Sequence, residues 1–528
     1  MSAYGQGMSR RRLLGVSGAA GAAFMVAGSG CGTLGQQTSG ELLASAGELP
    51  EPFTVPLPLP REARPEKAPD GSLRFDVAEK AADVEILPGR RTTVWGFDGT
   101  FPGPTFRVPS GTTARVRVAN ELPVPTSTHL HGGVTPPDSD GYPTDLVVPK
   151  GMDTRHLGHH GGHMKVDRKH WTFHRRGKEY VYPLEQRAAT LWYHDHRMDF
   201  SAPQVWKGLA GFFLVEDATE SRLPLPAGEK ELPLMICDRS FDADGQFRYP
   251  SLDGTLLGEP GVKSDYAEGV QGDVVLVNGA PWPTHEVEAT RYRLRLLNAS
   301  NARRLSLELD PGPEGRRSFV QIGSDNGLLA RPKRHDALPL APAERLDVVV
   351  DFSRFRVGTK VRLVNTLGEG GTRDVMEFHV VRKGTEHSSV PAKLADVERL
   401  KPEEAVRERR FDFRQSLKDG VHIWTVNGET FSPAGSLASP ALGSVERWKF
   451  TSDFHHPVHV HLAHFQVLAR NGREPRATDA GWKDTVDVRP YEVVEVLAKF
   501  DGYRGRYMMH CHNLEHEDMA MMANFRVV

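Results

Sequence analysis

The chain has 528 residues, enough for about three domains of ordinary size, each with its own hydrophobic core. Its 66 Lys and Arg residues nearly balance 68 Asp and Glu residues, and this net charge of −2 gives no sign of a nucleic-acid partner. After residue 30 no apolar run reaches the ~20 residues needed to cross a bilayer, and a total of three cysteines excludes a disulfide framework.

Residues 1–31 have the pattern of an export signal. Ser9-Arg10-Arg11-Arg12-Leu13-Leu14 precedes a weakly apolar stretch rich in Ala and Gly, which resembles a twin-arginine signal. That pathway carries folded proteins, so it suits a protein that acquires a buried cofactor before export. Gly28-Ser29-Gly30-Cys31 also resembles a lipoprotein cleavage site, and acylation of Cys31 would anchor the protein to the outer face of a membrane. We therefore expect a secreted, periplasmic or other cell-envelope location, with or without a lipid anchor, and a linker over residues 32–72.

An internal repeat follows the linker. Its unit is an Asn/Asp-Gly pair followed by a strand with alternating apolar residues, and it occurs three times. Such strands, separated by many Gly and Pro residues, predict Greek-key β-sandwiches and not α/β units. We expect a first domain over residues 73–218, a middle domain over 219–395 and a last domain over 396–528. The three pairs and their strands are Asp98-Gly99 with Arg115–Val118, Asn278-Gly279 with Tyr292–Leu296, and Asn427-Gly428 with Val445–Phe450.

Histidines are concentrated in the first and last domains, where eleven of the 23 fall into four dense groups. A lone histidine on a strand is more often a core or surface residue than a ligand, but four such groups are not expected by chance. Because residues i and i+2 of a strand point to the same face, each H-x-H pair aims two imidazoles one way. The groups are His129 and His131; His194 and His196; His456, His459, His461 and His464; and His510, His512 and His516.

The middle domain lacks both groups. Arg304–Leu307 and Glu377–Val380 stand at the places where the repeat would put them. We therefore expect the middle domain to keep the fold without a metal, as a spacer and scaffold.

The segment His510-Cys511-His512 predicts two metal sites joined by a single residue. In an extended strand its two histidines face one side and the cysteine faces the other. Cys511 together with His456, His516 and the weak thioether ligand Met521 is the blue-copper combination, which serves one-electron transfer. Zinc is the competing prediction, but a structural zinc site needs neither eight further histidines nor a lone methionine.

Eight histidines remain, half in the first domain and half in the last. They must meet where the two domains meet, and eight neutral imidazoles are enough for three copper ions with open positions for an oxidant. Asp195 stands in the first domain where Cys511 stands in the last, so we expect a thiolate-bound copper in the last domain alone. The eight are His129, His131, His194, His196, His459, His461, His510 and His512.

Taken together, the motifs in residues 129–141, 192–196, 456–462 and 510–518 resemble those of three-domain multicopper oxidases, similar to bacterial spore-coat laccases and bilirubin oxidases. The resemblance covers about Phe75 to Val528. It implies an all-β chain of three consecutive cupredoxin-like domains that hold four copper ions. The implied ligands are His456, Cys511, His516 and axial Met521 for the type 1 copper; His129 and His459 for type 2; and His131, His194, His196, His461, His510 and His512 for the type 3 pair.

The activity implied by this resemblance is that of a laccase. A phenol, an aromatic amine or a similar small donor would lose single electrons at the type 1 copper, and dioxygen would be reduced to two waters at the other three ions. Cys511 and His516 would serve electron transfer, while Glu517 and Asp140 match acidic residues that relay protons in the family. The alternative for these two carboxyl groups is that they only orient histidines. Two other functions stay open: oxidation of Cu(I) or Mn(II), and copper binding or electron carriage without turnover.

A further histidine-rich insert, from His156 to His174, contains many Gly, Arg and Lys residues. That composition is typical of a solvated surface loop, and an accessory copper or zinc site is the alternative. His455 and His464 lie beside predicted ligands but out of register with them, so we predict neither as a ligand. The identity of the donor and the oligomeric state do not follow from the sequence.

Overall fold

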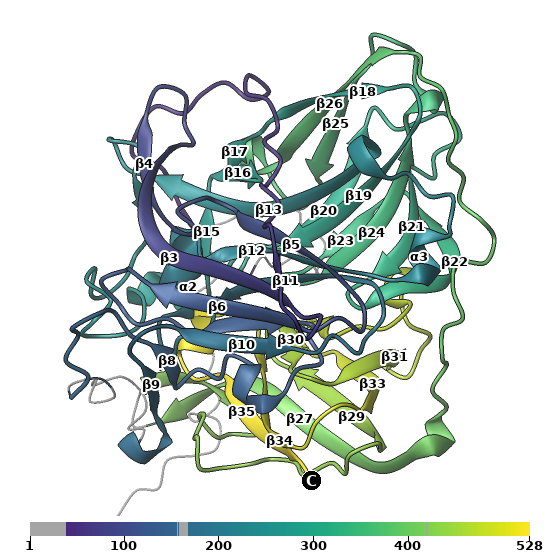
Figure 1. Ribbon diagram of the computed structural model, residues 1–528. Coiled ribbons are helices and arrows are strands. Elements are labelled where there is room, and N and C mark those ends of the chain that lie inside the picture. Colours follow the sequence, from purple (N-terminus) through teal and green to yellow (C-terminus); the bar gives the residue numbers. More distant parts are fainter. Residues whose placement is uncertain (1–38, 156, 158–166, 419–420) are drawn as a thin grey trace, which may run out of the picture. The chain divides into compact units, whose positions relative to one another are not determined.

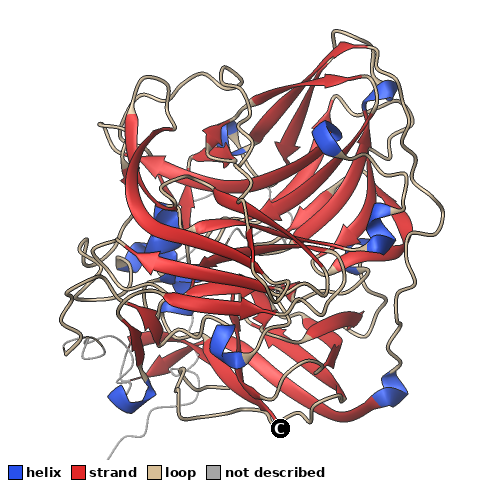
Figure 2. Cartoon of the chain, in the orientation of Figure 1, coloured by secondary structure: helices blue, strands red, loops and turns tan. Residues whose placement is uncertain are grey.

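The computed structural model (Figure 1) describes residues 39–155, 157, 167–418 and 421–528. The predicted export segment with Cys31 lies outside the described residues, as do His156, His159, His160 and His163 of the insert. Strands dominate the described part of the chain and the helices are short (Figure 2), which confirms the predicted all-β class. Among the described residues no helix is long and apolar enough to cross a membrane.

Two sheets form the first domain. One has the order β10-β6-β3-β2, with β4 paired to β3, and the other has the order β5-β12-β11-β7. A separate pair, β8 with β9, lies beside them. The strands are β2 (Glu66–Lys67), β3 (Leu73–Glu85), β4 (Arg91–Phe97), β5 (Gly103–Pro109), β6 (Ala114–Asn120), β7 (Thr128–His131), β8 (Asp145–Val147), β9 (Thr172–His174), β10 (Lys178–Tyr182), β11 (Ala189–Asp195) and β12 (Ala210–Glu216).

The middle domain is also built from two sheets. Their orders are β17-β16-β13-β19-β24-β21-β22, with β14 on β13, and β18-β26-β25-β20-β23. β1 (Glu41–Leu43), from the predicted linker, pairs in parallel with β15 (Val270–Gly272). The other strands are β13 (Glu231–Phe241), β14 (Phe247–Arg248), β16 (Val274–Val277), β17 (Ala280–Pro281), β18 (Thr284–Glu288), β19 (Arg291–Asn298), β20 (Leu305–Asp310), β21 (Phe319–Ser324), β22 (Gly327–His335), β23 (Leu338–Leu340), β24 (Arg345–Asp351), β25 (Lys360–Asn365) and β26 (Asp374–Arg382).

The last domain repeats the two-sheet plan, with the orders β28-β27-β29-β33-β31 and β32-β30-β34-β35. Its strands are β27 (Ala405–Lys418), β28 (Val421–Val426), β29 (Val445–Ser452), β30 (His456–Val460), β31 (His464–Arg470), β32 (Thr485–Val488), β33 (Val493–Lys499), β34 (Gly505–Cys511) and β35 (Met522–Val527). The α-helices of the described chain are α2 (Ser201–Lys207), α3 (Ala218–Ser221) and α4 (Leu514–Asp518). The 3₁₀ helices are η1 (Pro137–Ser139), η2 (Arg168–His170), η3 (Gly228–Lys230), η4 (Ser264–Tyr266), η5 (Phe352–Arg354), η6 (Gly370–Thr372), η7 (Pro402–Glu404) and η8 (Ala477–Asp479).

The predicted repeat is present in the backbone. Each predicted alternating strand pairs in parallel with the strand that begins its domain: β6 with β3, β19 with β13, and β29 with β27. Both residues of every Asn/Asp-Gly pair have positive φ, the combination that a type I′ turn requires. The φ values are 56° and 69° at Asp98-Gly99, 51° and 85° at Asn278-Gly279, and 56° and 80° at Asn427-Gly428.

One part of the repeat interpretation was wrong. In the second sheet of each domain, one strand pairs in parallel with a segment from earlier in that domain; this strand is β12, β26 or β35. The next strand of the sheet, antiparallel to it, is β11, β25 or β34. Glu377–Val380 lies on β26, so it matches β12 and β35, which carry no predicted ligand. The strand equivalent to the ligand strands β11 and β34 is β25, which ends at Asn365. Strand order fixes this assignment, and a similar local spacing does not.

Each domain has its own apolar core, and the core of the middle domain extends into the first. Trp192 and Phe212, on β11 and β12, pack into the same cluster as Leu234 and Leu296 of the middle domain. The sheet that carries the first histidine groups is therefore covered on one face by its own domain and on the other by its neighbour. Cys237 is a buried residue of this cluster.

Candidate metal centres

The four histidine groups lie at neighbouring strand positions on either side of the junction between the first and last domains. In the first domain, His129 on β7 is opposite His194 on β11. In the last domain, His459 on β30 is opposite His510 on β34. The two sheets meet with the rings of His131, on β7, and His459, on β30, stacked at a centroid distance of 3.6 Å. The register therefore brings the predicted ligands together.

All eight of these histidines are buried, and their ring nitrogens form three groups in which the ligand atoms lie within 4.8 Å of one another. Two groups match the predicted type 3 ligands, and each takes histidines from both domains. In the third, Nε2 of His129 lies 3.4 Å from Nε2 of His459, the two predicted type 2 ligands. The groups are His131, His194 and His512; His196, His461 and His510; and His129, His131 and His459.

The state of these imidazoles suits a metal. Burial, reinforced by neighbouring histidines, lowers the pKa of His194 to about 3 and that of His131 and His512 well below the usual value. The rings are therefore neutral at neutral pH, the form that binds copper. Nδ1 of His131, Nε2 of His194 and both ring nitrogens of His512 have no hydrogen-bond partner within the described chain. Since a buried polar atom without a partner costs free energy, coordination to a metal fits these positions.

The fourth group is the predicted type 1 site. Nδ1 of His456 lies 3.3 Å from Sγ of Cys511 and 3.1 Å from Nδ1 of His516, and Sγ lies 3.6 Å from Nδ1 of His516. All three residues are buried. Met521 is buried beside them: its carbonyl accepts a hydrogen bond from the Cys511 backbone at 3.1 Å, and its own N–H donates to the His516 carbonyl at 2.9 Å. The triangle of one thiol and two imidazoles is the arrangement that the sequence predicts.

Two contacts close the outer side of His516, and no sequence pattern indicated either of them. Its Nε2–H donates to the backbone carbonyl of Glu268, in the middle domain, at 3.2 Å. The indole of Trp424 stacks on its ring with a centroid distance of 3.7 Å. Burial also raises the pKa of the Cys511 thiol well above the usual value, so the thiolate that copper needs forms when a metal displaces the proton.

His510-Cys511-His512 joins the two centres as predicted. Nε2 of His510 lies 3.3 Å from Nε2 of both His196 and His461, and His512 belongs to the group with His131 and His194. Cys511 faces the type 1 group instead. Nδ1–H of His510 also donates to the Cys511 carbonyl at 3.1 Å, which adds a hydrogen-bonded contact to the covalent connection.

The two predicted acidic residues both contact histidines of these groups. Glu517 places Oε1 3.2 Å from Nδ1 of His196 and Oε2 3.0 Å from Nδ1 of His510. Burial opposes its ionisation, but these histidines prevail and lower the pKa of Glu517 to about 2. Asp140 accepts from Nδ1–H of His461 at 2.8 Å, and burial raises the pKa of Asp140 to about 8. The contacts suit orientation of the histidines, while the raised pKa of Asp140 leaves it a proton to give.

A third carboxyl group at the histidines, Asp484, was missed because its place after Trp482-Lys483 follows no spacing rule. Its Oδ1 lies 2.9 Å from Nε2 of His131. Burial opposes its ionisation, but Arg345 and His131 hold the pKa of Asp484 well below the usual value. Arg345 comes from the middle domain, so that domain also reaches the histidine groups.

The remaining predicted residues lie outside the groups found in the described chain. Nε2 of His464 lies 3.0 Å from the Gly132 carbonyl, and His455 is buried without a place in any group. In the described part of the insert, Nε2 of His174 lies 2.6 Å from a carboxylate oxygen of Asp145. Asp195 accepts the backbone N–H groups of Ser127 and Arg197 and so holds the turn after β11.

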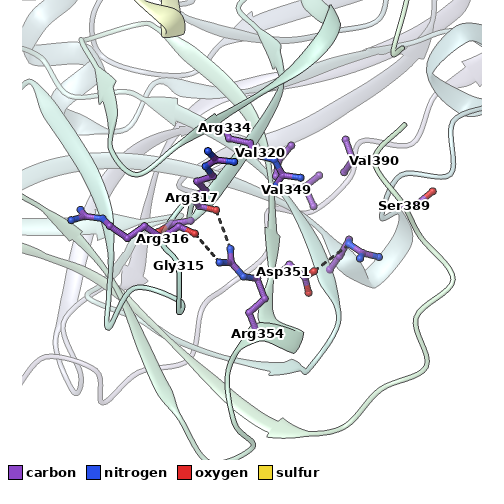
Figure 3. Close-up of a pocket in the computed structure, with 12 residues that line it drawn as sticks. Gly315, Arg316, Arg317, Val320, Arg334, Val349, Asp351, Arg354, Ser389 and Val390 are labelled. Atoms are coloured by element: carbon purple, nitrogen blue, oxygen red, sulfur yellow. Dashed lines mark hydrogen bonds and ion pairs between the residues drawn. The ribbon is translucent and has the colours of Figure 1, made fainter. Parts of the chain in front are cut away.

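A cavity of about 330 Å³ in the middle domain is lined by arginines (Figure 3). Arg354 donates to the carbonyls of Arg316 and Arg317 at 2.7 and 3.0 Å and so fixes the loop at its edge. A second cavity, of about 350 Å³, is lined by His464, Trp482 and residues of the first domain. Neither cavity is lined by a predicted copper ligand.

Comparison with known proteins places the geometry in context. A family model described as "Multicopper oxidase" matches residues 398–528, and a second model with the same description matches 79–157 and 161–220. A laccase from Bacillus stratosphericus is 34% identical, with 90% of this chain and 99% of the relative covered. A bilirubin oxidase from Albifimbria verrucaria is 33% identical over 90% of this chain and 81% of the relative. The crystal structure of a multi-copper oxidase from Pediococcus acidilactici has a TM-score of 0.76 and 30% identity, covering 92% of this chain and 93% of that one.

Proposed function

This chain belongs to the multicopper oxidase family, and on that premise we propose that it is an exported laccase-type oxidase of phenols, aromatic amines and similar donors. It is a copper-dependent oxidoreductase with cupredoxin-like domains, four copper ions, small-molecule donors and dioxygen as the acceptor. Bound copper would supply one-electron redox chemistry, by which four electrons from donor molecules and four protons would convert dioxygen to two waters. The residues that hold and serve these ions are part of the proposal.

The type 1 site is assigned to His456, Cys511 and His516, which would hold the ion, with Met521 as an additional weak thioether ligand. The observation that carries the proposal is this buried triangle, linked through His510-Cys511-His512 to the three-histidine groups. Burial excludes water from the thiolate. The Cys511 carbonyl and the ring of His510 provide a short connection toward the other ions.

The type 2 ion is assigned to His129 and His459, and the type 3 pair to the other six histidines. Two groups of three fit the pair: His131 with His194 and His512, and His196 with His461 and His510. Two protein ligands, His129 and His459, would leave coordination positions of the type 2 ion open.

Proton delivery is assigned to Asp140. Oδ2 of this residue accepts from His461, whereas Oδ1 has no hydrogen-bond partner in the described chain and can carry the proton. With a pKa of about 8, the carboxyl is protonated at neutral pH and can donate in the general-acid step. Glu517, whose carboxylate oxygens lie 3.2 Å from Nδ1 of His196 and 3.0 Å from Nδ1 of His510, is assigned to orient these two rings.

Oxygen uptake by copper-loaded protein tests the function. With an electron-rich phenol we expect one dioxygen consumed per four donor electrons, without release of peroxide. Cys511→Ser should lose both the blue colour and the uptake, because the thiolate ligand and the connection to His510 are gone. A blue, fully loaded protein that consumes no dioxygen with any organic donor would contradict the laccase assignment. Cu(I) and Mn(II) as donors then separate a metallo-oxidase from a carrier without turnover.

Export and anchoring are supported by the sequence pattern alone. A buried copper cluster that needs a folded chain agrees with a pathway that carries folded proteins. Replacing Arg10, Arg11 and Arg12 by Lys should leave the enzyme in the cytoplasm, as cell fractionation would show. The mass of the mature N-terminus, compared with that of Cys31→Ala, decides between a lipid-anchored and a free protein.

A further inference from the structure

Asp484 contacts histidines that are assigned to two different copper sites. Its side chain, through Oδ1, lies 2.9 Å from Nε2 of His131, an assigned type 3 ligand. Its backbone carbonyl lies 2.9 Å from Nδ1 of His459, an assigned type 2 ligand. The two rings stack at a centroid distance of 3.6 Å with an angle of 17°. One residue, just before β32, therefore contacts both members of this stacked pair.

These contacts fix the tautomers of both rings. A carboxylate and a carbonyl can only accept, so the nitrogens that face them carry the protons. His131 is then protonated on Nε2 and keeps the lone pair of Nδ1, an atom without a hydrogen-bond partner among the described residues. His459 is protonated on Nδ1 and keeps the lone pair of Nε2, which lies 3.4 Å from Nε2 of His129. Asp484 thus sets two stacked imidazoles in opposite tautomers.

Arg345, the first residue of β24 in the middle domain, holds Asp484 in place. Its two terminal nitrogens donate to the two carboxylate oxygens, with Nη1 2.7 Å from Oδ1. The other three N–H groups donate to backbone carbonyls: Nε to Thr190 at 3.0 Å, Nη1 to Ala343 at 2.9 Å and Nη2 to Asp325 at 3.1 Å. All five donors are used, and a bidentate pair of this kind fixes direction as well as distance. Its partners belong to all three domains.

Gly132 shows how closely this ion pair packs against the ligand strand. Gly132 follows His131 with a φ of +84°, and a Cβ there would lie 2.7 Å from Nη2 of Arg345 and 2.7 Å from Oδ2 of Asp484. The pair therefore leaves no room for a side chain at the end of β7. Both of its members are also almost fully buried.

We propose that Arg345 and Asp484 are a positioning pair, which sets the tautomers of His131 and His459 and so completes the type 2 and type 3 sites only when all three domains are docked. The inference rests on the proposed function, because the copper ligands named there include both histidines. It gives the middle domain, expected to be a scaffold, a part in forming the copper cluster.

The test is Asp484→Asn in the full-length, copper-loaded enzyme. An amide of the same shape must turn one N–H toward either Arg345 or His131, so one of the two contacts is lost. We expect copper of the three-ion cluster to be held 10- to 100-fold less tightly against a chelator, the range typical of lost partners behind metal-bound histidines. The electron paramagnetic resonance signal of type 2 copper should change, while the blue absorption of type 1 copper should persist.

Arg345→Lys gives a second variant with the same readouts. Lysine keeps the charge but cannot bind both carboxylate oxygens in a fork, so the changes should have the same direction and be smaller. If Asp484→Asn does not fold, this variant decides the proposal.

Asp347→Asn is the matched control. Asp347, on the same strand as Arg345, makes a buried two-oxygen ion pair with Arg293 and contacts no assigned copper ligand within the described chain. Asp347→Asn should lower the free energy of unfolding, but the folded variant should still bind four copper ions and give an unchanged type 2 signal. The proposal is overturned if both Asp484→Asn and Arg345→Lys keep the wild-type signal and copper affinity, or if Asp347→Asn changes them equally. Wild-type protein that binds no copper would instead overturn the proposed function.

Discussion

The proposed type 1 site and the proposed three-ion cluster differ in how far apart along the chain their assigned ligands lie. His456, Cys511 and His516 all come from the last domain. The other three groups of histidines span residues 129–512, and each group combines the first domain with the last. A type 1 site can therefore form when one domain folds, whereas the three-ion cluster also depends on how two domains dock. Contacts between domains are thus part of the metal chemistry.

The middle domain makes the difference less absolute, because it touches both sites without supplying a ligand. The Glu268 carbonyl accepts from Nε2–H of His516, and Arg345 reaches the cluster through Asp484. At the type 1 site the contact is one hydrogen bond to a backbone atom. At the cluster the contact is the guanidinium of Arg345, whose five N–H groups are all hydrogen-bonded and which acts through Asp484. The cluster should therefore be the more sensitive of the two to changes in the middle domain.

The largest expected effect is that of His194→Ala, which should abolish dioxygen uptake while the type 1 site stays intact. His194→Ala removes one of three histidines around an assigned type 3 ion, so dioxygen uptake should fall to the rate of copper-free protein. The type 1 group shares no ligand with His194, and the blue absorption should stay. Copper content, visible absorption and oxygen uptake, measured together, check this outcome. His464→Ala, which removes a non-ligand histidine beside the cluster, should keep all four ions; uptake at the wild-type rate by His194→Ala would refute the assignment.

A change at Trp424 should act on the type 1 side alone. The buried indole stacks on His516 at 3.7 Å, and replacing it by Ala should cost about 3–5 kcal/mol of unfolding free energy. The blue absorption should shift while the type 2 signal stays. Trp424→Phe keeps an aromatic ring but loses the 3.2 Å hydrogen bond from Nε1–H to the Ala267 carbonyl, so it should lower the free energy of unfolding by about 1 kcal/mol. Urea unfolding measures the stability of the two variants, and spectra of the folded proteins measure their copper signals. A changed type 2 signal would contradict the claim that Trp424 acts on the type 1 site alone.

Gly132→Ala should act on the cluster side through the backbone. Strain at φ +84° costs about 1–3 kcal/mol, and the new Cβ would also meet Arg345 and Asp484. Gly111→Ala is the matched control, because Gly111 has a φ of +75° and a Cβ added there would have nothing within 4 Å. We expect both variants to lose stability in urea and only Gly132→Ala to lose copper from the cluster. Equal copper contents would show that the contact with the ion pair is unimportant.

How much the sequence could predict follows the same division. Assigned ligands that lie close together along the chain, such as His510-Cys511-His512, were predicted with their opposite facings, because strand periodicity alone decides which side each residue faces. The three Asn/Asp-Gly pairs that marked the repeat are also explained by a local rule, since two consecutive residues with positive φ favour these residue types. Local rules were sufficient in both cases.

Contacts made by docking could not be predicted. Nothing near Arg345 or Asp484 in the sequence indicates that they meet, because their pairing depends on the packing of β24 against β11 and β32. The misplacement of Glu377–Val380 has a related cause: matching short segments cannot tell β26 from β25 without the strand order. Glu268 reaches His516 through a backbone atom, which no side-chain pattern encodes.

The smallest expected effect on the copper sites accompanies a pH dependence of stability that originates in the first domain. Glu79 is buried beneath β7 and accepts hydrogen bonds from Thr126 and Thr128; burial raises the pKa of Glu79 to about 8, and the nearby charge of Asp195 adds to the shift. An unfolded chain would bind this proton with a pKa of 4.5. Between these values the folded state holds more protons at Glu79, so the contribution of Glu79 to stability is greatest below pH 4.5 and falls as the pH rises toward 8, by at most about 1.4 kcal/mol per pH unit.

Glu79→Gln, compared with wild type in urea unfolding at several pH values from 5 to 8, isolates this contribution. An amide carries no titrating proton, so the slope of unfolding free energy against pH should become shallower. It should not vanish, because burial also raises the pKa of Asp195, to about 7. Asp76→Asn, at an exposed position of the same strand, should keep the wild-type slope. An unchanged slope in Glu79→Gln would mean that Glu79 is ionised in the folded protein. Glu79 accepts a hydrogen bond from Thr128, the first residue of the strand that carries His129 and His131. A shallower slope would therefore show that a buried acid beneath the two-domain cluster, and not beneath the type 1 site, titrates in this pH range.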